Sequence, residues 1–162
     1  MLNYINYFND IPPQLATVII AALPVAENRV SVPLALGVYY LPVWQALFFS
    51  ILGSVLAAAC VVYGLHFIYR RLQGRLGIGD RILQKIFERT ERKFTQKYQR
   101  WGELALLIFV AVPLPMTGAW TGSIAAFLFG IKPARALLFI SIGVILSAGI
   151  MALLSLGIIH FI

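Results

Sequence analysis

Charged residues are scarce in this sequence. Of its 162 residues only 12% are charged, six are acidic, and 60% are hydrophobic. A water-soluble domain carries about a quarter charged residues. The shortage of charge therefore excludes an ordinary soluble fold and indicates a protein that lies in a membrane.

Cysteine is nearly absent, and the motifs of soluble enzymes are missing. Cys60 is the single cysteine, so the chain can form neither an internal disulfide nor a cysteine pair for zinc. The sequence contains no hydrolase elbow, phosphate-binding loop, zinc-ligand spacing or paired carboxylates. We therefore expect no enzyme activity, no catalytic residues, no cofactor and no metal site.

Basic residues are missing from the N-terminus. Residues 1–14 contain no Lys or Arg ahead of the first apolar run, so the basic region of a cleavable signal peptide is absent. We expect the mature protein to start at Met1. Residues 1–11 are rich in aromatic side chains, which predicts a short anchor at the membrane interface.

Two long runs lack charge altogether. Val43–Ile68 and Ala136–Ile159 extend for 26 and 24 residues without Asp, Glu, Lys or Arg. At ~1.5 Å per helical residue, each run exceeds the ~30 Å hydrocarbon core of a bilayer. We predict transmembrane helices at 43–68 and 135–159.

Two further apolar regions, 13–41 and 103–131, are each interrupted in the middle. Each arm has only about ten residues, roughly half of what a membrane helix needs. Pro24 and the polar cluster Glu27-Asn28-Arg29 interrupt the first region, and residues 113–122 interrupt the second. Proline removes an amide donor and disfavours helix in the preceding residue. We predict two re-entrant hairpins, which enter the membrane and return to the same side.

The two halves of the chain repeat each other. An offset of 91 residues aligns Pro24 with Pro115 and Pro42 with Pro133, and both halves read apolar arm, polar break, apolar arm, long helix. Repeats built of interrupted segments are typical of transporters. The sequence thus predicts an all-α integral membrane protein with a single membrane domain, residues 1–162. It would be an inverted repeat of two units, each a re-entrant helical hairpin plus one full transmembrane helix.

Basic residues gather in one place. Ten of the thirteen lie between Arg70 and Arg100, directly after the first long helix. The positive-inside rule makes loop 69–101 cytoplasmic, and this location argues against nucleic-acid binding. Lys132 and Arg135 fall on the same side, and both termini fall outside. Residues 81–101 have helical amphipathic spacing, so this helix lies on anionic lipid headgroups or packs on the protein itself.

Glu27 and Arg29 are the only ionisable residues at predicted membrane depth, where an ionisable group is costly unless it is paired or faces water. Arg29 offers donors suited to a phosphate or carboxylate. Glu27 can exchange a proton if burial favours its neutral form. Two other interpretations stay open: a structural Glu27–Arg29 pair that closes the turn, or exposure of both at the interface.

The second turn offers uncharged groups. Thr117, Gly118 and Thr121 leave hydroxyl and backbone groups available, and the arm that follows begins a helix whose N-terminal amides favour anions. Trp120 would stack on a substrate or simply pack. Alternatively, the small residues only let two hairpins approach each other. The candidate substrate-binding residues are Arg29, Asn28, Thr117, Gly118, Trp120 and Thr121, with Glu27 for proton coupling.

Two motifs resemble a known family. The segments LPVAENRVSVPLAL at 23–36 and VPLPMTGAWTGSIAAFLFG at 112–130 resemble the small multidrug export protein family, a relative of the DedA (VTT-domain) membrane proteins. The first family motif has an acidic residue, one intervening residue and Arg ahead of an Ile-Pro or Val-Pro pair, matched here by Glu27, Arg29, Val32 and Pro33. The second family motif reads Pro-Leu-Pro-Gly-Thr-Gly-Ala-Trp, and this chain has Met116 where the Gly before Thr is usual. The likeness covers nearly the whole chain.

The resemblance implies a multi-pass protein of a bacterial or archaeal inner membrane. Some DedA relatives are implicated in moving lipid-linked phosphates with the proton-motive force, using acidic and Arg residues at the hairpins. We therefore expect a proton-linked transporter of an amphipathic or anionic substrate. The alternatives are a flippase or scramblase for polyprenyl phosphate or phospholipid, and a non-transporting scaffold. Because two full helices enclose little volume, we expect a homo-oligomer, a dimer.

Overall fold

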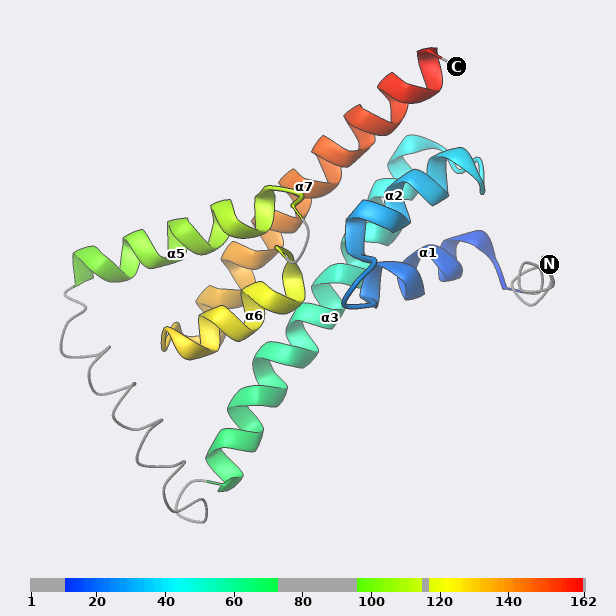
Figure 1. The fold of residues 1–162 in the computed structure, drawn as a ribbon. Coiled ribbons are helices and arrows are strands. Elements are labelled where there is room, and N and C mark those ends of the chain that lie inside the picture. The colour runs from blue at the N-terminus through cyan, green and yellow to red at the C-terminus, as the bar shows by residue number, and fades with distance from the viewer. Residues whose placement is uncertain (1–10, 73–95, 115–116, 162) are drawn as a thin grey trace.

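The computed structural model describes residues 11–72, 96–114 and 117–161, and within these ranges every regular element is a helix (Figure 1). Two helices are long and four are short. In chain order they are α1 (Pro13–Ala22), α2 (Glu27–Gly37), α3 (Val43–Leu72), α5 (Gln96–Ala111), α6 (Ala119–Leu128) and α7 (Pro133–Phe161).

The long helices α3 and α7 match the two predicted spans. Their segments Val43–Arg71 and Pro133–Gly157 are long and apolar enough to cross a membrane. Proline stands directly before α3 and at the first position of α7, where its missing N–H has no partner to lose. Figure 1 shows the two helices crossing in opposite directions along the chain.

The short helices form two helical hairpins, α1 with α2 and α5 with α6. Figure 1 shows that both connecting turns lie in the middle of the molecule. The α1–α2 hairpin opens toward the end where α7 finishes, and the α5–α6 hairpin opens toward the end where α3 finishes. The two hairpins thus approach each other from opposite ends.

Each hairpin packs on both long helices. Within the first half, α1 and α2 contact α3, and within the second half, α5 and α6 contact α7. In addition α2 contacts α7 and α6 contacts α3, so the second arm of each hairpin crosses to the long helix of the other half. This exchange holds the two halves together as one body.

Glycines allow the first arm of each hairpin to approach its long helix closely. A Cβ added to Gly53 of α3 would overlap the Val18 carbonyl of α1. A Cβ added to Gly143 of α7 would lie 2.9 Å from the Leu107 carbonyl of α5. Small residues at helix contacts are typical of membrane bundles, because they let the backbones approach.

Small side chains also dominate the interior, whereas large apolar side chains face outward. Leu153 of α7, for example, is 74% exposed. A soluble protein has the reverse arrangement, so this surface suits lipid. Two buried clusters make the core: Ala58, Val62, Leu106, Val110, Ala119, Ala126, Ala136, Ile140 and Val144, and Val32, Ala35, Leu36, Ala46, Ala148 and Ala152.

Several predicted boundaries are wrong by a few residues. The polar cluster 27–29, expected in a turn, forms the first helical turn of α2, and α6 begins at Ala119 inside the expected turn 113–122. Helix α5 already begins at Gln96, within the predicted surface helix 81–101. The earlier part of that helix lies outside the described residues. The starts of α2 and α6 depend on contacts with the other half of the chain, which local sequence does not reveal.

Candidate functional site between the two hairpin turns

Glu27 of the first hairpin caps the second hairpin. Its side chain is buried, with 8% of the residue exposed. The carboxylate oxygen Oε2 accepts a hydrogen bond from the Ala119 amide at 3.3 Å, and Oε1 accepts one from the Trp120 amide at 3.2 Å. These are the first two amides of α6, which have no partner within their own helix. A negative charge at this place also interacts favourably with the helix dipole.

Gly118 makes room for this contact. It directly precedes α6, and a Cβ at this position would overlap the Glu27 carboxylate. Thr121 supports the same turn, because its Oγ1 accepts a hydrogen bond from the Gly118 amide at 3.0 Å. Gly118 and Thr121 were predicted to bind substrate. In this structure they shape the α6 N-terminus around Glu27.

The backbone of Glu27 adopts an unusual conformation. Its φ is 44°, in the left-handed region. That region costs a residue with a side chain about 1–2 kcal/mol, and such outliers persist where the surroundings hold them. Here the two amides of α6 hold the carboxylate. A strained residue held in this way is a candidate functional position.

Trp120 makes the reciprocal contact. Its indole Nε1 donates a hydrogen bond to the Ala22 carbonyl at 3.0 Å. Ala22 is the last residue of α1, where carbonyls lack partners within the helix. Each hairpin therefore caps one helix of the other hairpin. We call this set the hairpin interlock: the Glu27 carboxylate with the Ala119 and Trp120 amides, and the Trp120 indole with the Ala22 carbonyl.

Asn28, predicted to contact substrate, is engaged by the protein. The residue is 4% exposed, its Nδ2 donates to the Val144 carbonyl of α7 at 3.1 Å, and its Oδ1 accepts from the Ser54 hydroxyl of α3 at 2.9 Å. Beside it, the Ser31 hydroxyl donates to Ser50 at 2.9 Å. Buried polar groups of this kind fix how helices fit together. In this structure Asn28 positions α2 against both long helices.

Thr117 is used within its own turn. Its Oγ1 accepts from the Leu114 amide at 3.1 Å and contacts the carbonyls of Leu114 and Val112 at 2.8 and 2.7 Å as a donor. A threonine side chain that bonds nearby backbone in this way stabilises a turn. Its hydroxyl thus closes the α5–α6 connection.

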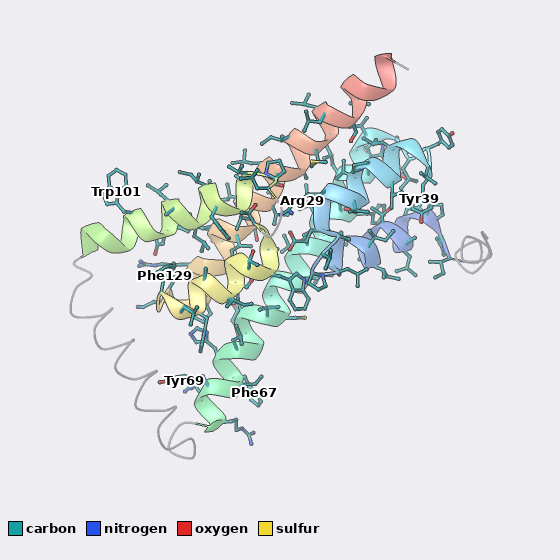
Figure 2. All side chains as sticks on the ribbon, viewed as in Figure 1. Arg29, Tyr39, Phe67, Tyr69, Trp101 and Phe129 are labelled. Carbon is teal, nitrogen blue, oxygen red and sulfur yellow. The ribbon has the colours of Figure 1, made fainter. Side chains whose placement is uncertain are left out.

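Arg29 keeps its donors available. The side chain is partly buried, and its guanidinium forms no hydrogen bond or ion pair with any residue that the structure describes. It does not pair with Glu27, although its charge acts on that carboxylate at longer range. Figure 2 shows Arg29 on α2, close to the middle of the molecule. Arg29 is the one cation among the predicted site residues, and its donors can receive an anion.

Sequence reasoning missed the groups that complete the interlock. The Ala119 and Trp120 amides and the Ala22 carbonyl are backbone atoms, and residue type carries no signal for them. Among the described residues, no cluster of three or more His, Cys, Asp or Glu side chains could hold a metal ion.

Comparison with known families identifies the chain. The family model described as "Putative small multi-drug export protein" matches residues 27–150. The chain belongs to this family. A search of curated proteins and a search of solved structures gave no match. The stretch matched to the small multi-drug export family begins at Glu27 and contains both sides of the Glu27–α6 contact. Membership in this family and the two long apolar helices together indicate a membrane protein.

Proposed function

We propose that this small multi-drug export family protein is a proton-linked transporter that moves an amphipathic or anionic substrate past the hairpin interlock. The observation that carries the proposal is the buried Glu27 carboxylate, held between the two hairpins by the first amides of α6. An ionisable group at membrane depth is a candidate for function by default.

The hairpins are re-entrant in this proposal, and the two halves form an inverted repeat. Helices α1 and α6 have 10 residues each, a length of about 15 Å, or half of the hydrocarbon core. The opposed directions of α3 and α7 and the exchange of second arms support the same interpretation. In transporters of this design, substrate binds where the broken helices meet.

Glu27 would control the interlock through its charge. In the charged form the carboxylate stabilises the α6 N-terminus, an interaction worth about 0.3–1 kcal/mol and up to ~2 kcal/mol when partly buried. A proton on Glu27 removes that charge and weakens both hydrogen bonds. The protonated interlock therefore opens more readily, which lets the two hairpins move apart and exposes the centre to one side of the membrane at a time.

Arg29 would link the substrate to the proton. The charge of Arg29 acts on Glu27 and favours its charged form. An anion bound at the free guanidinium donors offsets that effect, so proton binding at Glu27 becomes easier when substrate is present. Linkage is reciprocal, and proton binding at Glu27 therefore strengthens anion binding at Arg29.

A flux assay tests the proposal. The purified protein is reconstituted in liposomes with a trapped pH-sensitive dye, and fluorescent amphipathic anions carrying carboxylate, sulfonate or phosphate are added. We expect anion movement that depends on an imposed pH gradient and is accompanied by proton movement. Translocation of a labelled phospholipid headgroup without flux of these anions would replace the proposal by a lipid flippase. If neither anion flux nor lipid translocation occurs, the proposal is wrong and the non-transporting scaffold becomes the working hypothesis.

Substitution of Arg29 tests the anion site. Arg29→Ala should raise the anion concentration that gives half-maximal flux about tenfold or more, because a guanidinium–anion contact contributes about 1.5–3 kcal/mol. Arg29→Lys keeps the charge but loses the planar guanidinium. Its half-saturating anion concentration should therefore lie between those of the wild type and Arg29→Ala. Saturation curves in the same liposomes measure this. An Arg29→Ala curve that coincides with wild type would exclude Arg29 from substrate binding.

A further inference from the structure

One end of the molecule differs in charge from the other. It is formed by the end of α3, the start of α5, the end of α6 and the start of α7 (Figure 1), and we call it the basic end. Exposed on it are four cations: Arg70, Arg71, Lys132 and Arg135. The described segments at the opposite end, 11–20, 38–50 and 150–161, contain no Lys or Arg.

Acidic side chains do not neutralise the basic end among the described residues. The two acidic residues in the described ranges, Glu27 and Glu103, are both buried. Glu27 lies in the interlock, and Glu103 pairs with Arg135. The intervening segment 73–95 adds six basic and three acidic residues by sequence. Among the described residues, Arg135 is therefore the one cation of this end with an acidic partner, and Arg70, Arg71 and Lys132 have none.

Two guanidinium groups are held in place at the basic end. Arg71 stacks over the Phe67 ring at 5.1 Å from its centroid. The Arg135 Nη1 atom lies 3.2 Å from the Glu103 Oε1 atom, while 55% of the Arg135 side chain stays exposed. Arg71 is exposed and Arg135 uses only Nη1 in its ion pair, so each guanidinium keeps donors for a ligand. A fixed guanidinium fork matches the oxygen geometry of a phosphate.

Exposed aromatic side chains also lie at the basic end. Phe67, Trp101 and Phe129 are exposed, and Figure 2 shows all three at the basic end. Aromatic rings of this kind concentrate at the depth of lipid headgroups. Next to them the exposed surface is apolar, with Ile68, Leu128 and Leu138. Cations at the rim of an apolar surface suit a ligand that has an anionic head and a hydrocarbon tail.

We infer that the basic end binds the headgroups of anionic phospholipids, with phosphate oxygens at Arg71 and Arg135 and the acyl chains on the neighbouring apolar surface. Lys132 and Arg70 add positive charge around these two positions. This site is separate from the hairpin interlock, and it stands or falls independently of transport. A soluble acidic partner fits less well, because it would leave the adjoining apolar surface uncovered.

The inference is tested with the full-length protein in lipid nanodiscs. Nanodiscs of phosphatidylcholine are compared with nanodiscs that also contain phosphatidylglycerol, and both the thermal unfolding midpoint and the retained lipid are measured, the latter by native mass spectrometry. We expect phosphatidylglycerol to raise the midpoint and to be retained preferentially, and both effects to shrink at high salt.

Charge variants identify the residues. The triple variant Arg70→Gln, Arg71→Gln, Lys132→Gln should lose preferential retention by about fivefold for each cation removed, while Arg135 stays in place to pair with Glu103. The charge-conserving variant Arg70→Lys, Lys132→Arg keeps every positive charge of the basic end and leaves Arg71 and Arg135 unchanged, so it should keep the preference. Equal retention by the triple variant and the wild type would overturn the inference. Equal stabilisation by soluble polyglutamate in zwitterionic nanodiscs would also overturn it, in favour of an acidic protein partner.

Discussion

Liposomes that contain the Glu27→Gln variant are expected to lose proton-linked flux while the protein still inserts and folds. Glutamine has nearly the same shape, and its oxygen can still accept from one α6 amide. Glutamine carries no charge and exchanges no proton. Its NH2 group replaces one carboxylate oxygen, so one α6 amide faces a hydrogen-bond donor instead of an acceptor. The trapped pH dye measures the loss directly, and we expect the folded protein to be destabilised by only about 1 kcal/mol.

A matched carboxylate provides the control. Glu103 is also buried, but it lies at the start of α5 and pairs with Arg135. The Glu103→Gln variant should therefore keep pH-driven flux while showing a comparable change in stability. Wild-type flux in Glu27→Gln, or an equal loss in both variants, would exclude a specific proton role for Glu27.

Replacing Gly118 with alanine should damage both stability and transport. The added methyl group would overlap the Glu27 carboxylate, so the carboxylate or the α6 N-terminus has to move. Overpacking of this kind typically costs about 1–3 kcal/mol. The unfolding midpoint in detergent and the flux in liposomes should fall together, because the same displacement breaks the hydrogen bonds of Glu27 to α6.

Two comparisons separate this effect from a general intolerance of alanine. Gly149 lies within α7 with open space around its missing Cβ, so Gly149→Ala should leave the protein unchanged or stabilise it by up to ~1 kcal/mol. In addition, Glu27→Ala removes the group that the new methyl would meet. The cost of Gly118→Ala should then shrink in the double variant, a non-additivity expected of residues in contact. Additive costs would show that Gly118 acts without Glu27.

The architecture was predictable where the signal is local. The runs 43–68 and 136–159 located α3 and α7, because they contain neither charge nor proline and are long enough to span a bilayer as one helix. The interrupted regions predicted four short arms, and the structure has α1, α2, α5 and α6 in those regions. The starts of α2 and α6 were placed too late. Glu27 and the amides of α6 are 92 and 93 positions apart, so no local window contains both partners of the cap.

The sequence indicated which residues belong to the candidate site, but it did not indicate their hydrogen-bond partners. Glu27 stood out because a carboxylate is rare in an apolar segment, and it does lie where the two hairpins meet. Its expected alternative partner, Arg29, is not its hydrogen-bonding partner. The actual donors are backbone amides, which every residue carries. For the same reason the sequence could not show that Asn28 bonds the Val144 carbonyl or that Thr117 closes its own turn.

The interlock also gives the two halves of the chain different roles. The first hairpin contributes the charged group, and the second contributes the amides, the glycine that admits the carboxylate, and the indole of Trp120. If the two halves are a repeat, as proposed, this contact is not repeated between them. In the proposed transport cycle, this single carboxylate would take up a proton from either side of the membrane, depending on which hairpin has moved.

The central claim is that two hairpins meet inside the membrane from opposite faces, and single-cysteine labelling tests it most directly. In a Cys60→Ala background, cysteines replace Val25 and, separately, Leu114, which are exposed at the tips of the two turns. A membrane-impermeant maleimide is then applied to each face. The account predicts that Val25→Cys reacts only from outside and Leu114→Cys only from the cytoplasm. Reaction of Val25→Cys from the cytoplasm alone would mean that the first hairpin crosses the whole membrane, and the interlock could then not lie at its centre.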